Sequence, residues 1–257
     1  MLLDGLAGWQ IYIIAVVFQY IRYVVIVGAI HLTFWVLLKK WTEKRQVSQK
    51  RFTNADIRRE LKASFWFVCA VSVPVSFLAM PEYIGYTKLY FNLSDYPLWW
   101  PPLSFVVLLL GQDAYFYWTH RLMHSPMLFK SMHSTHHTSM YPSAFAAFAM
   151  HPSEAIVASG FNLFMVLLVP MHFQTFMVYQ LVQLLLNVYG HLGADPLPDS
   201  WRSKPILKHL NRTPAHAGHH KFYTVNFGLY FTFWDRWMGT FDERTAPIDA
   251  PMKRAQA

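Results

Sequence analysis

Long apolar stretches dominate the pattern of hydrophobic and polar positions along the chain. Residues 10–38 are almost wholly apolar, interrupted by Arg22 and His31, and a helix of this length, rising about 1.5 Å per residue, can cross a bilayer. Further apolar stretches cover residues 64–80, 96–118, 155–169 and 173–189. Together they predict about four or five membrane-spanning helices, with a kink at Pro74 in the second. The last two stretches are short enough that re-entrant helices stay an alternative.

Composition supports a membrane protein and narrows the fold class. Of the 257 residues, 54% are hydrophobic and only 14% are charged, which excludes disorder and argues against an ordinary soluble domain. The single cysteine, Cys69, excludes an intramolecular disulfide and a zinc site built from several cysteines. We therefore expect an all-α fold, a polytopic membrane helical bundle. One domain would cover residues 1–257: N-terminal spans and a basic loop in 1–95, a histidine-rich region in 96–241, and a loose C-terminal tail in 242–257.

The distribution of basic residues predicts the topology. Nine of the 22 Lys and Arg residues lie between positions 39 and 62, and eleven follow His120. By the positive-inside rule these segments are cytoplasmic, and the N-terminus then lies outside. We expect the first apolar stretch to be a retained span in a bacterial inner membrane or the endoplasmic reticulum. The net charge of +8 does not indicate nucleic-acid binding, because the basic residues lie beside the spans, where topology and anionic lipids account for them.

Histidines form three clusters with the spacing of metal ligands. They read HRLMH at 120–124, HSTHH at 133–137 and HAGHH at 216–220. Histidines four residues apart share one face of a helix, so each cluster can present two or three imidazoles to one point, and imidazole suits iron, zinc, copper and nickel. In the predicted topology all three clusters reach the cytoplasmic boundary, and His191 joins them. Nine imidazoles are too many for one tetrahedral zinc and fit two metal ions in a cytoplasmic histidine-rich cap. Three other histidines are expected to be packing residues: His31, His172 and His209.

These clusters, together with HPSE at 151–154 and NFGLYFTFWDRWMGT at 226–240, resemble the fatty acid hydroxylase/sterol desaturase superfamily of integral-membrane di-metal oxygenases. The resemblance runs from about Asp113 to Phe241. It implies two iron ions as cofactors, which zinc can replace in purified protein, and O2 as co-substrate. It implies nine metal ligands: His120, His124, His133, His136, His137, His191, His216, His219 and His220. Some hydroxylases of this family have a further histidine where this chain has Asn187, so Asn187 either holds a metal through water or leaves a position open.

Several polar side chains are candidates to orient the ligands, since ligating histidines usually donate their second N–H to a carboxylate or carbonyl. Asp113 lies seven residues before His120 on the same helix face, so it orients a ligand, lines the substrate entrance, or pairs with Arg22 or Tyr117. His151 precedes a proline and is expected at a helix start. Further candidates are Glu154, Asp195, Asp199 and Asp235, although the Trp234, Asp235 and Arg236 run is expected to serve packing and ion pairing.

The resemblance implies O2-dependent hydroxylation of an unactivated C–H bond in a lipid or sterol, and desaturation is the alternative within the same family. The sequence shows no haem-binding module, so the electrons are expected from a separate donor, a ferredoxin or cytochrome b5 with its reductase. A histidine-rich metal transporter is an alternative of another class. It is disfavoured because a transporter places its polar ligands near the bilayer midplane, whereas these clusters gather at one interface.

Overall fold

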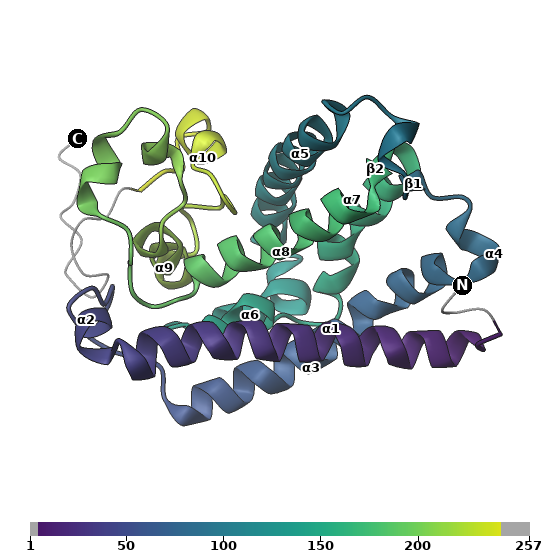
Figure 1. Ribbon diagram of the computed structural model, residues 1–257. Coiled ribbons are helices and arrows are strands. Elements are labelled where there is room, and N and C mark those ends of the chain that lie inside the picture. Colours follow the sequence, from purple (N-terminus) through teal and green to yellow (C-terminus); the bar gives the residue numbers. More distant parts are fainter. Residues whose placement is uncertain (1–4, 243–257) are drawn as a thin grey trace.

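The computed structural model describes residues 5–242, so the predicted tail after Asp242 lies outside the described residues. The described part is mainly helical (Figure 1). The α-helices are α1 (Gly8–His31), α2 (Lys39–Glu43), α3 (Asn54–Ala79), α4 (Pro81–Ile84), α5 (Trp100–Met123), α6 (Ser134–His137), α7 (Glu154–Leu168), α8 (Phe173–Gly190), α9 (Thr213–Phe222) and α10 (Phe233–Trp237). Two π-helical turns cover Leu32–Leu37 and Phe129–His133. Short 3₁₀ segments cover Leu93–Asp95, Ala144–Phe148, Asp199–Ser203 and Leu207–His209.

Two helices in the described chain are long and apolar enough to cross a membrane. They are Gly8–Leu37, with mean hydropathy 2.2, and Asn54–Ala79, with mean hydropathy 1.7. The second begins ten residues before the apolar stretch predicted at 64–80, because Thr53 and Asp56 form a capping box that starts the helix in the polar segment. Helix α7 is a shorter apolar helix. Spans in α5, α7 and α8 stay predictions.

Helices α1 and α3 run antiparallel and are joined by polar contacts along their length. The Tyr12 hydroxyl donates to the Cys69 carbonyl at 3.1 Å, and the Gln19 amide donates to the Ser72 hydroxyl at 2.7 Å. Further along, the Tyr23 and Ser64 hydroxyls lie 3.0 Å apart, and the Tyr23 hydroxyl donates to the Phe145 carbonyl of the neighbouring Ala144–Phe148 segment at 2.6 Å. Hydrogen bonds of this kind hold membrane helices together where lipid offers no polar partner.

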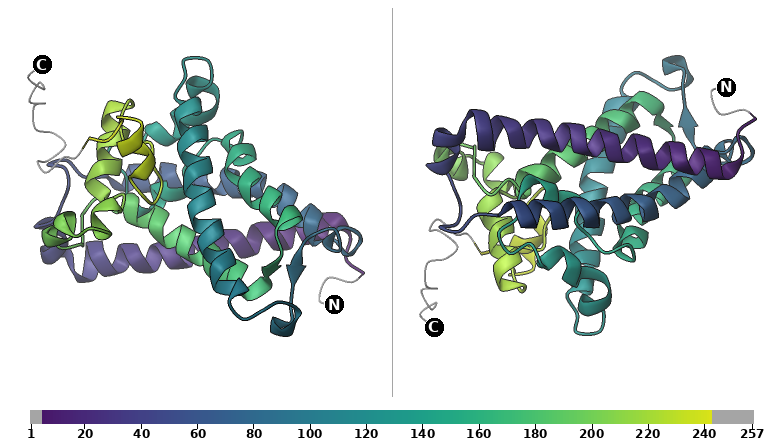
Figure 2. Two further views of the ribbon diagram at one scale, coloured as in Figure 1. Left: turned by 90° about the horizontal axis from the view of Figure 1, so that it is seen from above. Right: turned by 90° about the horizontal axis from the view of Figure 1, so that it is seen from below.

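The other long helices cross this pair, and α8 connects two apolar cores. Figure 2 shows α5 running across the direction of α1 and α3. One core packs α8 against α1 and the Ala144–Phe148 segment, with Tyr23, Val27 and Leu184 fully buried or nearly so. The other packs α8 against α5 and α7, around Leu108 and Tyr179. The C-terminal end of α8, where His191 lies, is therefore fixed from several sides.

One small sheet departs from the predicted all-α fold. Strand β1 (Leu89–Tyr90) pairs in parallel with β2 (Met171–His172), in the register Leu89 to Met171 and Tyr90 to His172. The pairing ties the connection before α5 to the short turn between α7 and α8, which has no regular hydrophobic alternation and gave no strand signal. His172 is buried here and contacts the Phe91 carbonyl at 3.2 Å.

The basic loop after α2 packs directly on the histidine-bearing segments. Gln46 forms an antiparallel bridge with Ala194, the Val47 amide donates to the Gly193 carbonyl at 3.1 Å, and the Asp195 amide donates to the Arg45 carbonyl at 3.0 Å. In Figure 1, α2 and α9 lie at the same end of α1. The basic loop and the third histidine cluster therefore lie on one side of the molecule. Which side of the membrane this is stays a prediction.

Candidate metal centre

The nine predicted ligands meet in the interior as two groups. One, the five-histidine group, consists of His120, His124, His133, His137 and His219. The other, the four-histidine group, consists of His136, His191, His216 and His220. Within each group the candidate ligand nitrogens lie within 4.8 Å of one another. The candidate ligand atoms therefore form two groups rather than one.

Each HxxHH cluster contributes to both groups. In the second cluster, the i and i+4 pair of His133 and His137 joins the five-histidine group, whereas His136 joins the other. In the third cluster, His216 and His220 join the four-histidine group and His219 crosses to the five-histidine group. The spacing predicted that each cluster can present two or three imidazoles to one point. The split arises because residues i and i+4 lie about 40° apart around a helix, while the histidine between them is rotated away by about 60°.

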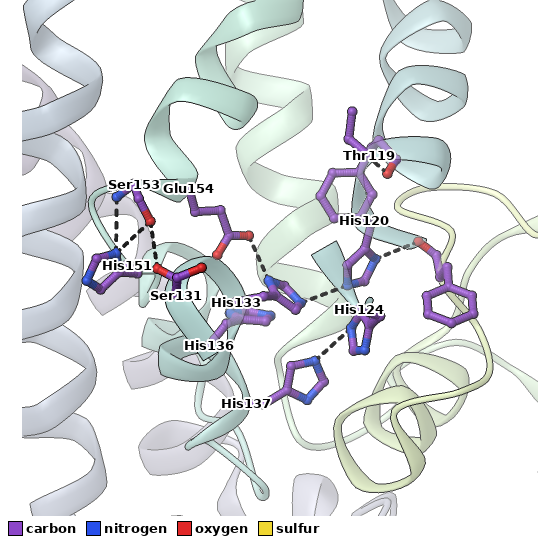
Figure 3. A network of polar contacts seen from close by, with 12 residues as sticks. Thr119, His120, His124, Ser131, His133, His136, His137, His151, Ser153 and Glu154 are labelled. Atoms are coloured by element: carbon purple, nitrogen blue, oxygen red, sulfur yellow. Dashed lines mark hydrogen bonds and ion pairs between the residues drawn. The ribbon is translucent and has the colours of Figure 1, made fainter. Parts of the chain in front are cut away.

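In the five-histidine group the inner nitrogens face one another across short distances. The His120 and His133 Nε2 atoms are 2.9 Å apart, and those of His124 and His137 are 3.1 Å apart (Figure 3). On the side facing away from the other histidines, His120 Nδ1 donates to the Phe227 carbonyl at 2.8 Å. A carbonyl only accepts, so the His120 proton is on Nδ1 and its Nε2 turns a lone pair inward.

Two more members of this group are oriented in the same way. His133 Nδ1 donates to the Glu154 carboxylate at 3.0 Å, and Figure 3 shows this carboxylate reaching toward the ring from α7. His219 Nδ1 donates to the Val225 carbonyl at 2.7 Å. The inner Nε2 of His219 is buried and has no hydrogen-bond partner among the described residues. The Nε2 lone pairs of His120, His133 and His219 thus converge, and one proton cannot form a hydrogen bond with all three.

In the four-histidine group, His191 lies close to each of the other three imidazoles. His191 Nε2 lies 2.9 Å from His216 Nε2, and 3.3 Å from the Nε2 atoms of both His136 and His220. His191 Nδ1 donates to the Asn187 carbonyl at 2.8 Å, one turn earlier in α8. This bond fixes the His191 tautomer and turns its Nε2 lone pair toward the other three rings.

A cation fits both groups. Burial lowers the pKa of all nine imidazoles, to about 4 for His191 and about 3 for His124, so they are neutral at physiological pH. Neutral imidazole is the form that binds metal, and lone pairs held about 3 Å apart repel unless a positive ion lies between them. The all-nitrogen donor set suits iron and zinc and does not suit magnesium or calcium.

Comparison with known proteins supports this chemistry. The model of the fatty acid hydroxylase family matches residues 105–240, just over half of the chain, and covers all nine histidines. This chain belongs to the fatty acid hydroxylase family. It is 32% identical over 197 residues to the lathosterol oxidase of Mus musculus, which covers 74% of this chain and 63% of that protein.

Two further relatives have similar names. The chain is 30% identical over 197 residues to the lathosterol oxidase of Homo sapiens, covering 74% of this chain and 63% of that protein. It is 28% identical over 198 residues to a Delta(7)-sterol 5(6)-desaturase of Gibberella zeae, covering 77% of this chain and 60% of that protein. The chain thus spans about three fifths of the length of these curated relatives. No solved structure matches it.

In this member of the hydroxylase family, the other predicted site residues lie at varied distances from the histidines. Glu154 is buried and contacts His133 directly. The Asn187 side chain donates to the Ala147 carbonyl at 2.9 Å, while its own carbonyl orients His191. His151 is exposed, contacts Ser153 at 2.7 Å and points away from the rings (Figure 3).

Four of the predicted carboxylates bind backbone amides or arginine side chains. Asp113 contacts neither Arg22 nor Tyr117 and accepts instead from the Tyr230 and Phe231 amides at 2.8 and 3.1 Å. Asp195 contacts Arg212 and Tyr189. The exposed Asp199 contacts Arg202 and Arg212. Asp235 accepts from the Phe227 and Gly228 amides. Within residues 5–242, Asp235 therefore serves backbone donors rather than the predicted ion pair.

The predicted packing histidines lie among aromatic rings. His31 lies between Phe52 and Phe145, with ring centroids 5.6 and 5.4 Å away, and His209 stacks on Phe233 at 4.7 Å. Together with His172 on β2, these residues lie outside both metal-binding groups.

Two features near the histidine groups were not predicted from the sequence. Glu60 of α3 is fully buried and accepts a hydrogen bond from the Ser143 hydroxyl, in the segment that follows the second histidine cluster. Glu60 shares one face of α3 with the buried Ser64 and Phe67, a pattern that indicates burial. The basic residues around it in the sequence hide this pattern. The second feature is the pair of carbonyl groups that orient His120 and His219. Backbone atoms of this kind have no residue-type signature.

Proposed function

We propose that this chain is a metal-dependent membrane oxygenase that uses O2 to oxidise an unactivated C–H bond of a sterol or other lipid. The observation that carries the proposal is the convergence of nine neutral imidazoles in two groups, with inner lone pairs that only cations satisfy. Membership of the fatty acid hydroxylase family supports the reaction class.

The bound groups that we propose are two iron ions, which would supply the redox chemistry that couples O2 reduction to C–H oxidation. The chain supplies the rest. The nine histidines hold the ions, and their outer partners, such as Glu154, keep each ring in one tautomer and orientation. Burial of α9 between the other segments keeps bulk water from the reacting carbon, because every residue from Thr213 to His220 is buried.

A sterol or lipid substrate is supported by the names of the relatives and by the setting. The apolar part of such a molecule can stay beside the membrane helices while one carbon reaches the histidine groups. Hydroxylation is our first candidate, because the matching family model is that of fatty acid hydroxylases and covers the histidine clusters. Desaturation is the second, because the relatives include lathosterol oxidases and a sterol desaturase.

We also propose a cytoplasmic orientation for the histidine groups and a separate electron donor of the ferredoxin or cytochrome b5 type. The orientation is supported by the packing of the basic loop against residues 193–195. If the donor binds this basic surface, turnover at sub-saturating donor falls as ionic strength rises, because salt screens the attraction. A rate that is independent of salt contradicts docking at this surface.

Lipid mass spectrometry tests the reaction. Cells expressing the wild-type chain are compared, in air, with cells expressing His136→Ala, and His209→Ala serves as the matched control outside both groups. A lipid that gains one oxygen in the wild type and control alone supports hydroxylation, and one that loses two hydrogens supports desaturation. If no lipid differs in a host that holds donors and sterols, and the purified wild type binds no metal, the proposal is wrong.

A further inference from the structure

A short loop between α9 and α10, residues 225–231, carries the acceptors that orient two imidazoles. His219 donates to the Val225 carbonyl at 2.7 Å, and His120 donates to the Phe227 carbonyl at 2.8 Å. Both histidines belong to the five-histidine group, and no described hydrogen bond joins this loop to the other group. The position of one candidate metal site therefore depends on where this loop lies.

Asp235 fixes the loop at the residue that orients His120. Its Oδ1 accepts from the Phe227 amide and its Oδ2 from the Gly228 amide, both at 2.8 Å. The Thr240 hydroxyl donates to Oδ1 at 2.8 Å. Asp235 is 1% exposed, so water cannot replace these bonds. One carboxylate thus holds the amide groups on both sides of the Phe227 carbonyl.

The far end of the loop and its middle are fixed as well. Asp113 of α5, 2% exposed, accepts from the Tyr230 and Phe231 amides. At Gly228, an added Cβ would collide with the Phe231 carbonyl oxygen and would lie 2.8 Å from the Asp235 carboxylate. The turn is so tight that only glycine fits where the carboxylate approaches the backbone.

We propose that Asp235 is a positioning residue for one metal site: by fixing the 225–231 loop it holds the Phe227 and Val225 carbonyls against His120 and His219. The inference rests on the proposed metal centre. Loss of a partner that orients a ligating histidine typically weakens metal binding about 10- to 100-fold. Replacement of Asp235 therefore weakens one of two metal sites by about that factor and leaves the four-histidine site unchanged.

The chemistry of the substitution is specific. In Asp235→Asn one oxygen remains, but the amide NH2 faces a backbone N–H that needs an acceptor, so at least one loop bond is lost. The matched control is Asp199→Asn, which makes the same change at a carboxylate that is 91% exposed. Gly228→Ala displaces the same loop, by collision with the Phe231 carbonyl oxygen, while residue 235 stays an aspartate. Thr240→Val removes one hydrogen bond to Asp235 and is the mildest variant.

The test is a Co2+ titration of the purified full-length protein in detergent against a competing chelator, with absorption spectra that report each bound ion. We expect two equivalents for the wild type and Asp199→Asn. For Asp235→Asn and Gly228→Ala we expect one equivalent with unchanged affinity and one weakened about 10- to 100-fold. If Asp235→Asn does not fold, Thr240→Val carries the test, with a smaller loss at the same single site.

The outcomes separate the inference from the proposed function. If the wild type binds no Co2+, the proposed metal centre is wrong, whatever Asp235 does. If the wild type binds two equivalents and the Asp235 and Gly228 variants bind both with wild-type affinity, the positioning role is wrong. Equal weakening at both sites, together with a lower melting temperature, also overturns it, because that result indicates a general structural role.

Discussion

The two histidine groups are built from the same residue type but are held in different ways. In the five-histidine group, three imidazoles donate Nδ1–H to partners outside the ring: two loop carbonyls and the Glu154 carboxylate. In the four-histidine group, His191 donates to the carbonyl of Asn187 on its own helix. In the described part of the chain, the Nδ1 atoms of His136 and His220 in this group, and of His137 in the other, have no hydrogen-bond partner. The orientation of the first group therefore depends on hydrogen bonds to distant segments, whereas the second is brought together by the packing of α6, α8 and α9.

That packing has its own polar anchor. The Thr213 hydroxyl at the start of α9 donates to the Tyr189 carbonyl at the end of α8 at 2.7 Å. Arg212 beside it donates to Asp195 at 2.8 Å and to the Leu197 carbonyl at 2.8 Å. We therefore expect that each group can be weakened alone, by changing residues that lie outside both groups.

The largest effect is expected from removal of one ligand from either group. His219→Ala should abolish one metal equivalent and His216→Ala the other, each reducing lipid oxidation by more than the roughly 100-fold that loss of an outer partner causes. Metal content of the purified proteins, measured by plasma mass spectrometry, checks this. If both variants lose both equivalents while remaining folded, the two groups are one cooperative site and the comparison fails.

The next effect breaks the anchor of the four-histidine group. Arg212 is 5% exposed, and its removal in Arg212→Met leaves Asp195 buried without its closest cation. Breaking a buried pair costs up to about 3–5 kcal/mol, and Arg202, 3.6 Å from Asp195, offsets part of that cost. The melting temperature should still fall, and the four-histidine site should lose metal first. Thermal unfolding with metal titration measures both.

A double variant serves as the control for this anchor. Asp195→Leu with Arg212→Met removes both charges, and replacing a buried pair by apolar residues is often neutral for stability. It should recover most of the melting temperature. If the double variant is as unstable as Arg212→Met, the cause is lost packing around Arg212 rather than the loss of the ion pair between Asp195 and Arg212.

A smaller effect is expected in the five-histidine group. Glu154→Ala leaves the buried His133 Nδ1–H without its acceptor, so the five-histidine site should bind metal about 10- to 100-fold more weakly. Glu154→Gln should recover much of this affinity, since an amide oxygen also accepts. Chelator competition measures it. Weakening at the four-histidine site, or no recovery with glutamine, contradicts the assignment.

That the three clusters meet at one centre could be predicted because their spacing carries a signal, whereas His191 was placed with them by the predicted topology. Histidines at i and i+4 share a helix face wherever the helix lies, and those of the second and third clusters do meet in space. Their division between two groups could not be predicted, because it depends on how α5, α6 and α9 are arranged around one another.

Asp113 shows where sequence reasoning stops. Its depth and its place on the His120 face correctly marked it as a buried acid near the centre, yet its partners are amides 117 and 118 residues later in the chain. Contacts at such separations, and acceptors that are backbone carbonyls, leave no local pattern. The same holds for the fold: apolar stretches indicate the long helices, whereas the pairing of β1 with β2 depends on a contact between distant turns.

The smallest effect concerns the outer face of the five-histidine group. Tyr223 ends α9 in the left-handed region, at φ 64°, where glycine is preferred, and its ring stacks on His137 with centroids 4.5 Å apart. Tyr223→Gly relieves about 1 kcal/mol of backbone strain and loses about 0.5–1.5 kcal/mol of ring contact, so the melting temperature should barely change.

Metal exchange, in contrast, should become faster in this variant. The Tyr223 ring also contacts Phe129, with centroids 5.6 Å apart, and together they cover His137 on its outer side. Without the Tyr223 ring, chelator reaches the five-histidine site more easily, while release from the four-histidine site keeps its wild-type rate. Stopped-flow chelation measures the two rates. Tyr223→Phe is the control, because it keeps the stacked ring, and it should behave as the wild type. Equal acceleration at both sites would show that Tyr223 shields no single group.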